Sequence, residues 1–135
     1  MNQPKQAEHG FYDQYKASAS RNVRPASWLG KDDFKACVRE WADKLGVKTH
    51  SLSMRPMRHK WASCSTAGRL TFNVELLQLD RELGNYVIVH ELLHFFVPNH
   101  GRLWKSLMRA YLGEYESVSR RLPARHDLAR IEQTD

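Results

Sequence analysis

The sequence predicts a single α+β domain in which a small antiparallel sheet packs on a buried helix and on flanking helices. Its 135 residues, 41% of them hydrophobic, suffice for one domain with its own core. Along the chain, apolar residues show helical spacing, then strand-like alternation, then helical spacing again, as in α+β layouts. We expect this domain to span residues 31–122, between a polar N-terminal extension (1–30) and a polar C-terminal tail (123–135).

The first helix is expected from about Asp32 to Leu45. Acidic residues open this stretch and Gly46 closes it, which are the residue types that helix ends favour. One face is apolar and should pack into the core. This face is formed by Phe34, Cys37, Val38, Trp41 and Leu45.

A β-hairpin should follow this helix. Residues 59–64 and 69–74 have the pattern of its two arms, joined by a turn at residues 65–68. In the second arm apolar and polar residues alternate, so one face should be buried. A further strand is expected within residues 47–54, and it would complete the small antiparallel sheet.

The next helix is expected from about Asp80 to Phe96 and should be buried. Its apolar residues recur at helical spacing and also fill the flanks, so the helix is apolar on nearly all sides. Two histidines and a glutamate inside such a helix are costly without a partner. A metal ion would offset that cost, and the alternative is a buried, hydrogen-bonded polar cluster.

The stretch HELLH, which begins at His90, has the spacing of a metal site. Residues four apart lie on one face of a helix, so the imidazoles of His90 and His94 can reach the same ion. Glu91 lies about 100° around the helix, close enough to accept a proton from a metal-bound water. This pattern predicts two zinc ligands and a general base. Pro98 should end the helix, and His100 follows where the chain can turn back to offer a third ligand.

Two more helices are expected after this turn. Residues 103–112 carry an apolar stripe that ends at Gly113. Residues 114–122 could form a shorter helix before Pro123. With the helices before them, they would enclose the sheet and the metal helix.

Several motifs in a fixed order lie in two runs of the chain: MRHKWASCSTAGRLTFNVELL (residues 57–77) and VIVHELLHFFVPNHGRLW (residues 87–104). In this they resemble the YgjP-like zinc metallopeptidase family, which pairs a W-x-S-C-S segment and a strand with a buried H-E-L-x-H helix, P-N-H and an aromatic residue. The likeness covers roughly Asp32 to Tyr115. The matching positions are Trp61, Ser63, Cys64, Ser65, Asn73, His90, Glu91, His94, Pro98, Asn99, His100 and Trp104.

The resemblance implies a zincin-like fold and a zinc-dependent metallopeptidase that hydrolyses peptide bonds. By resemblance, His90, His94 and His100 bind one zinc ion per chain, and Glu91 is the catalytic base that activates a zinc-bound water. The hairpin would border the cleft, where an extended peptide or protein substrate could pair with a sheet edge.

A donor to the developing oxyanion is also expected, and the sequence offers several candidates without selecting one. They are Asn99, Arg58, Trp61 and Tyr111. The histidines without ligand spacing are expected on the surface or in strands. They are His9, His50, His59 and His126.

Charge leaves two further functions open. The net charge of +6 could attract nucleic acid or nucleotides, although ordinary solvated faces are the default explanation. One alternative is therefore a metal-dependent hydrolase of nucleotide phosphate anhydrides. Another is a zinc-stabilised module that binds nucleic acid or protein, against which the intact Glu91 argues, because structural zinc sites are usually closed by a fourth ligand.

We expect a cytoplasmic location and no membrane association. No apolar stretch reaches the length of about 18 residues that spans a bilayer. The first ten residues contain no apolar signal core. The two cysteines, Cys37 and Cys64, suggest no disulfide framework and should both be buried.

Overall fold

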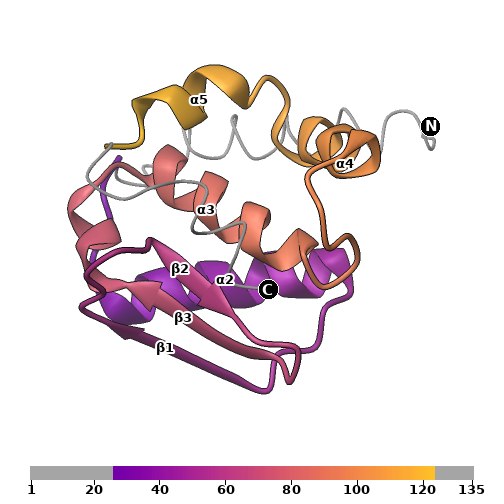
Figure 1. The fold of residues 1–135 in the computed structure, drawn as a ribbon. Helices are drawn as coiled ribbons and strands as arrows, with labels where there is room; N and C mark the ends of the chain where they lie inside the picture. Colours follow the sequence, from indigo (N-terminus) through magenta and orange to yellow (C-terminus); the bar gives the residue numbers. More distant parts are fainter. Residues whose placement is uncertain (1–25, 124–135) are drawn as a thin grey trace, which may run out of the picture.

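A computed structural model describes residues 26–123 of the chain, and Figure 1 shows their fold. The long helix α3 lies in the middle, between the sheet with helix α2 on one side and helices α4 and α5 on the other. The helices are α2 (Lys31–Leu45), α3 (Arg81–Leu93), α4 (Arg102–Leu112) and α5 (Glu116–Arg121). The strands are β1 (Ser51–Arg55), β2 (Ala62–Cys64) and β3 (Arg69–Asn73), followed by the 3-10 helix η1 (Val74–Gln78).

Helix α3 is the centre of the core, as its apolar surface predicted. Every residue from Leu83 to Leu93 is buried, and the helix contacts α2, α4, α5, η1 and β2. The side chain of Asp80 caps its first turn by accepting a hydrogen bond from the backbone N–H of Leu83 at 2.9 Å. A helix that is apolar on all sides can bury its whole surface only in the middle of the protein.

The sheet is mixed, so the prediction of a wholly antiparallel sheet was wrong for one pair of strands. Strands β2 and β3 form the predicted antiparallel hairpin, but β1 pairs parallel with β3, from Ser51 opposite Arg69 to Arg55 opposite Asn73. The strand order is β1-β3-β2, so β3 runs back between the two strands that precede it. Leu70 and Phe72 of β3 are almost fully buried, and a strand paired on both sides suits them best. Alternation along one strand defines its buried face but not its neighbours.

Asn73 ends β3, one residue earlier than expected, and ties the neighbouring loop to it. Its side chain is fully buried. The amide Nδ2 donates to the carbonyls of Met57 and Lys60, both at 2.9 Å, and Oδ1 accepts from the N–H of Glu75 at 3.0 Å. The β1–β2 loop and the start of η1 are therefore held by one side chain.

The other expectations about the described residues hold with small shifts. Gly46 ends α2 in the left-handed conformation, with φ of 73°. Cys37 and Cys64 are buried, and His50 and His59 are exposed. No helix within residues 26–123 is both long and apolar enough to cross a bilayer. His9 and His126 lie outside the described residues, and the expected boundaries at residues 30 and 122 stay a prediction.

Trp28 precedes α2 and belongs to the core. Its ring lies 4.7 Å from that of Phe34, and the guanidinium of Arg81 lies 4.5 Å from the centre of the indole. Ser27 forms a β-bridge with Asp80, so this segment is pinned to the start of α3. The indole is pressed against Gly84, where a Cβ atom would lie only 2.5 Å from a ring carbon of Trp28.

Replacing Gly84 with alanine should destabilise the protein by about 1–3 kcal/mol because of this overpacking. Helix propensity alone predicts the opposite, a gain of roughly 1 kcal/mol. Urea denaturation of the variant measures the free energy of unfolding, with Ser106→Ala on the exposed face of α4 as a control. A Gly84→Ala protein more stable than wild type would show that the close contact with Trp28 is not a constraint.

Candidate metal centre

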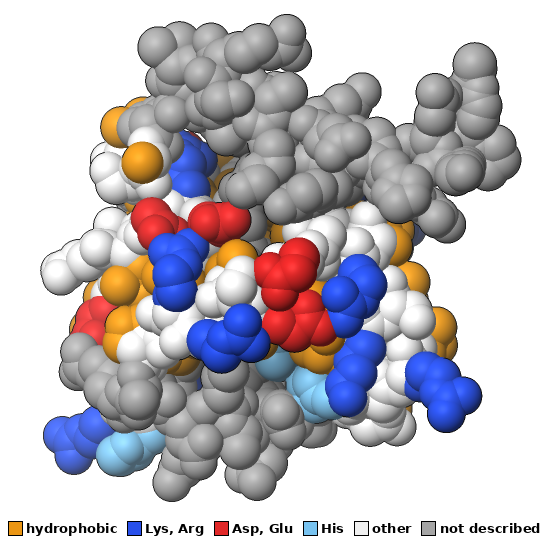
Figure 2. Space-filling view, turned by 90° about the horizontal axis from the view of Figure 1, so that it is seen from above, with side chains coloured by type: hydrophobic (Ala, Val, Ile, Leu, Met, Phe, Trp, Pro, Cys, Tyr) orange, Lys and Arg blue, Asp and Glu red, His pale blue; other side chains and the backbone are white. Residues whose placement is uncertain are grey.

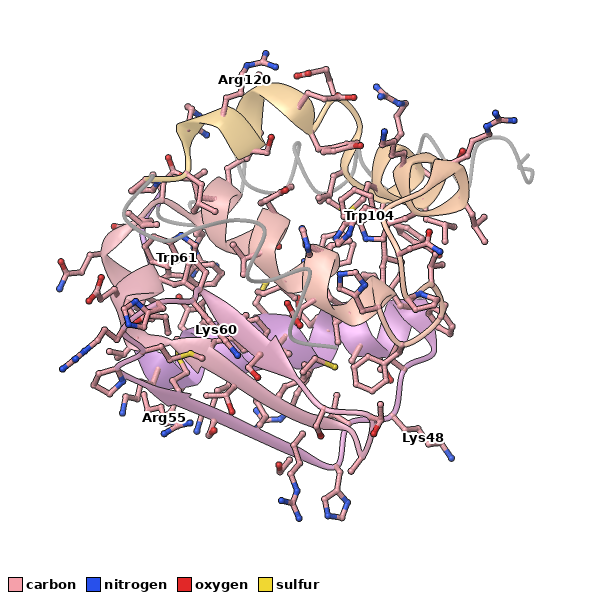
Figure 3. All side chains as sticks on the ribbon, in the orientation of Figure 1. Lys48, Arg55, Lys60, Trp61, Trp104 and Arg120 are labelled. Carbon is pink, nitrogen blue, oxygen red and sulfur yellow. The ribbon has the colours of Figure 1, made fainter. Side chains whose placement is uncertain are left out.

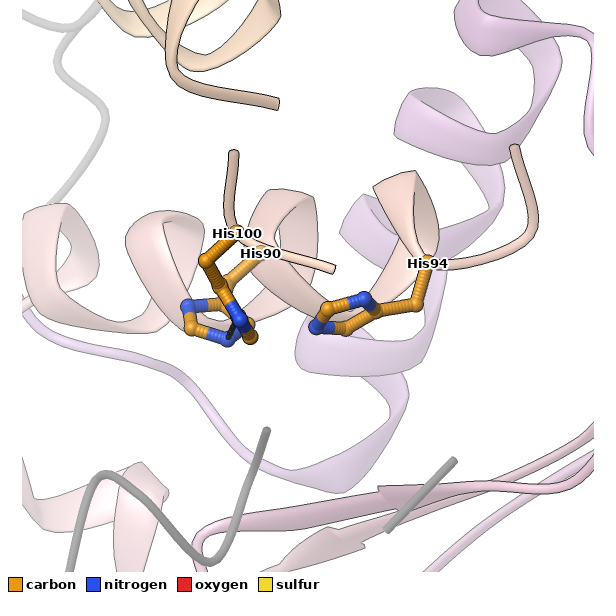
Figure 4. A group of neighbouring side chains, drawn as sticks. All are labelled: His90, His94 and His100. Atoms are coloured by element: carbon orange, nitrogen blue, oxygen red, sulfur yellow. Dashed lines mark hydrogen bonds between the residues drawn. The ribbon is translucent and has the colours of Figure 1, made fainter. Parts of the chain in front are cut away.

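Three histidines meet at the C-terminal end of α3. His90 and His94 project from one face of the helix, and His100 reaches back from the loop that follows (Figure 4). One ring nitrogen from each lies within 4.8 Å of the others, and the Nε2 atoms of His90 and His100 are 3.0 Å apart. His90 and His94 are buried and His100 is half-buried. The spacing predicted from the helix, and the return of His100, are both present in the structure.

The loop that returns His100 begins earlier than expected, because α3 ends at Leu93 and not at Phe96. The last turn tightens: the N–H of Phe95 donates to the carbonyl of Leu92 at 3.0 Å, a three-residue step. After Pro98, the side chain of Asn99 accepts a hydrogen bond from the N–H of Gly101 at 2.9 Å. This turn reverses the chain immediately around His100.

Hydrogen bonds to the outer nitrogens orient two of the rings. Nδ1 of His94 lies 3.0 Å from the carbonyl oxygen of Val97. A carbonyl only accepts, so this Nδ1 carries the proton and Nε2 keeps its lone pair for a metal ion. Nδ1 of His90 lies 3.4 Å from the hydroxyl of Tyr86, one turn earlier on α3. Both contacts present Nε2 to the space shared by the three rings.

Burial favours the neutral form of His90 and His100, the form in which imidazole binds metal. Burial, reinforced by His94 and His100, lowers the pKa of His90 well below 6.5. Burial, with His94 and Lys105 as further causes, lowers the pKa of His100 to about 4. Three imidazoles form a ligand set that suits zinc and related transition metals. The donors of a tetrahedral zinc site lie about 3.3 Å apart, close to the separation of His90 and His100.

Trp104, on the first turn of α4, packs against all three histidine rings. Ring centres lie 4.9 Å from His90, 6.4 Å from His94 and 4.5 Å from His100. The indole is 4% exposed, so it shields the imidazoles from water on this side. The sequence motif contained Trp104, but spacing alone assigned it no role.

Glu91 follows His90 on α3 and is fully buried. Its neighbours on either side in sequence, His90 and Leu92, are also buried, so Glu91 lies inside the protein on the helix that carries His90.

Comparison with known proteins identifies the family. The family model described as YgjP-like, metallopeptidase domain, matches residues 5–125. The chain belongs to the YgjP-like metallopeptidase family. The match extends on both sides of the stretch that carries the sequence motifs.

Two relatives from Methanocaldococcus jannaschii resemble this YgjP-like chain. The uncharacterized protein MJ0123 is 33% identical over 91 residues, which cover 64% of this chain and 83% of that protein. The crystal structure of the metallopeptidase zymogen jannalysin superposes with a TM-score of 0.60 at 30% identity, covering 66% of this chain and 92% of that one. The YgjP-like chain is therefore a metal-dependent peptidase with a zincin-like α+β fold, and its substrates are peptides or proteins.

A pocket adjoins the histidine cluster of this YgjP-like enzyme. It has a volume of about 210 Å³ and is lined by Cys64, Ser65, Thr66, His94 and Phe95. The hairpin turn forms one wall and the end of α3 the other. No lining side chain is an acid, a lysine or an arginine.

The expected oxyanion donors lie elsewhere or are engaged otherwise. Asn99 holds the loop turn through Gly101. Arg58 is exposed in the β1–β2 loop, and Trp61 is buried in the core. Tyr111 packs edge-on against Trp41, with ring centres 6.4 Å apart. The structure brings none of the four into the contacts described for the histidine rings.

Proposed function

We propose that His90, His94 and His100 hold one zinc ion and that Glu91 is the general base of peptide hydrolysis. The observation that carries this proposal is the convergence of three imidazoles, with ligand nitrogens within 4.8 Å of one another. The contact between His94 and the Val97 carbonyl supports it, because it places a proton on Nδ1 and directs Nε2 to the shared space. Three protein ligands leave a position for water or substrate, which is typical of catalytic zinc.

When bound, the zinc ion would polarise the scissile carbonyl and lower the pKa of a water molecule to about 7. The residues of the chain do the remaining work. Glu91 accepts the proton of the attacking water and returns it to the leaving amine. Trp104, packed on the three imidazoles, excludes bulk water from one side of the reaction and so strengthens the electrostatic interactions there.

Strand β2 offers a place for the peptide. It lies at an edge of the sheet and contacts α3, and the turn that follows it lines the pocket beside His94. An extended peptide paired with β2 would have alternate side chains directed to this pocket. A charged side chain buried there would lack an opposite charge, so the pocket should favour small uncharged side chains.

A chelation experiment tests the role of zinc. Purified protein is incubated with an unfolded protein such as casein, before and after treatment with 1,10-phenanthroline, and peptide release is measured. Release should stop on chelation and return on addition of about one equivalent of zinc, but not of magnesium, which prefers oxygen ligands. If hydrolysis persists in protein from which metal analysis shows that all zinc has been removed, the proposal is contradicted.

Two expectations stay predictions. A cytoplasmic location fits the buried thiols of Cys37 and Cys64, and localisation of a tagged chain would test it. Binding of nucleic acid or nucleotides through the basic surface rests on charge alone, and a binding experiment with duplex DNA tests it.

A further inference from the structure

The segment of the chain that contains the sheet has positively charged side chains and no negatively charged ones. Between Asp43 and Glu75 the chain contains no aspartate or glutamate. We call five residues of this segment the basic sheet face: Lys48, Arg55, Arg58, Lys60 and Arg69. All but the half-buried Lys60 are exposed. In Figure 3, Lys48 and Arg55 lie at opposite ends of the sheet.

The opposite side of the molecule is different, because several of its charges are paired. Arg121 contacts Asp80 at 2.9 Å and Glu82 at 2.8 Å, and Arg109 pairs with Glu116. Figure 2 shows acidic and basic side chains next to one another on that side. Among residues 26–123, no acidic side chain is recorded in a salt bridge with the basic sheet face. Its positive potential is therefore not cancelled locally.

The outward side of the sheet has small polar side chains between its cationic ends. Ser53, Thr71 and Ser63 lie opposite one another on the three strands, and the hydroxyls of Ser53 and Thr71 are 3.4 Å apart. Arg69 begins β3, and Arg55 is paired with the last residue of β3. Four residue steps separate these two rows, about 13 Å along the strand. An extended segment of four or five residues would span this distance.

One end of the basic sheet face adjoins, along the chain, the turn that lines the pocket beside the histidine cluster. Arg69 directly follows the turn at residues 65–68, whose Ser65 and Thr66 line that pocket with His94. The same turn is tied to the segment that carries Lys48, since the N–H of His50 donates to the carbonyl of Gly68 at 2.8 Å. A chain that leaves the pocket over this turn meets Arg69 and Lys48 first.

We propose that the basic sheet face binds acidic residues of the peptide substrate beside the bond to be cleaved. The proposal rests on the proposed peptidase function and names its substrate class: segments with several aspartates or glutamates next to a small uncharged residue. Guanidinium and ammonium groups recognise carboxylates, and hydroxyls can donate to them. Continuity with the pocket favours a peptide over nucleic acid. The exposed large apolar side chains of the described residues are Leu29, Phe96 and Leu103, none of them in the sheet, so the face offers no platform for stacked bases.

A binding experiment that needs no turnover tests this. The full-length Glu91→Gln protein is titrated against fluorescein-labelled (Glu-Ser)4 and (Gln-Ser)4, and fluorescence polarisation gives the dissociation constants at low and physiological salt. The acidic peptide should bind more tightly, and the difference should shrink as salt rises. The double variant Arg69→Gln, Lys48→Gln should weaken its binding roughly three- to tenfold, the range expected for losing two exposed ion pairs.

Arg120→Gln is the matched control, because Arg120 is exposed on α5, away from the sheet (Figure 3). Its binding should equal that of the parent protein. Equal affinity for the two peptides, or equal weakening by Arg120→Gln, would overturn the proposal. A DNA duplex of 12 base pairs is tested as well. If it binds more tightly than the acidic peptide, and if the double variant weakens only the binding of the duplex, the face binds nucleic acid and the proposal is overturned. The binding experiment does not depend on hydrolysis. A negative result in the peptidase assay can therefore be distinguished from a negative result in the peptide-binding experiment.

Discussion

Replacing Glu91 with glutamine should reduce peptide hydrolysis about 10²–10⁴-fold while leaving metal content and fold nearly unchanged. Glutamine keeps the shape of this fully buried side chain but cannot accept the proton of the attacking water. The rate with a labelled peptide, the metal content and the circular dichroism spectrum should be measured on one preparation. Glu40→Gln, exposed on α2, is the matched control and should behave as wild type.

Two outcomes would contradict this role of Glu91. A Glu91→Gln protein as active as wild type would remove Glu91 from catalysis. Loss of metal equal to that of a histidine variant would instead mean that Glu91 supports the metal site and does not act as the base.

Replacing His100 with alanine should lower the zinc content from about one per chain to a small fraction and abolish hydrolysis. His100 lies in a loop, so the variant should keep α3 intact while the site loses one of three ligands. His94→Ala should lose the metal as well, and more stability, because His94 is buried and metal binding free energy is linked to folding. Metal analysis and thermal unfolding with and without zinc measure both effects. His59→Ala, exposed on the surface, is the control.

Unchanged zinc affinity in His100→Ala would mean that another residue is the third ligand. From the sequence, Glu114 or His126 would be next. Glu114 already accepts hydrogen bonds from the backbone N–H of Ser117 at 3.1 Å and from its hydroxyl at 2.6 Å. These bonds hold the carboxylate near the start of α5, and His126 lies outside the described residues.

Properties that depend on neighbours in the chain could be read from the sequence. The spacing of His90 and His94 follows from the pitch of a helix, and the burial of α3 follows from its apolar surface. The hairpin followed from alternation and its turn residues. Tyr86 could also have been identified, because it precedes His90 by four residues and so lies on the same face.

Properties that depend on contacts between residues far apart in the chain could not be read from the sequence. The parallel pairing of β1 with β3 depends on which strand occupies the centre of the sheet, and alternation is the same in either arrangement. The end of α3 at Leu93 depends on three successive three-residue hydrogen bonds, donated by the N–H groups of residues 94–96, in a sequence that would equally continue a helix. The contact of Trp28 with Gly84 joins residues that no local pattern connects.

The proposed metal ligands and the far wall of the pocket come from different parts of the chain. The three histidines and the Trp104 that packs on them all lie between residues 90 and 104, so little loop-closure entropy opposes their assembly. The turn at residues 65–68 adds only the far wall of the pocket. Substitutions at Ser65 or Thr66 are thus free to alter which peptide is accepted without disturbing how the ion is held. Chemistry and selectivity can diverge independently in this fold.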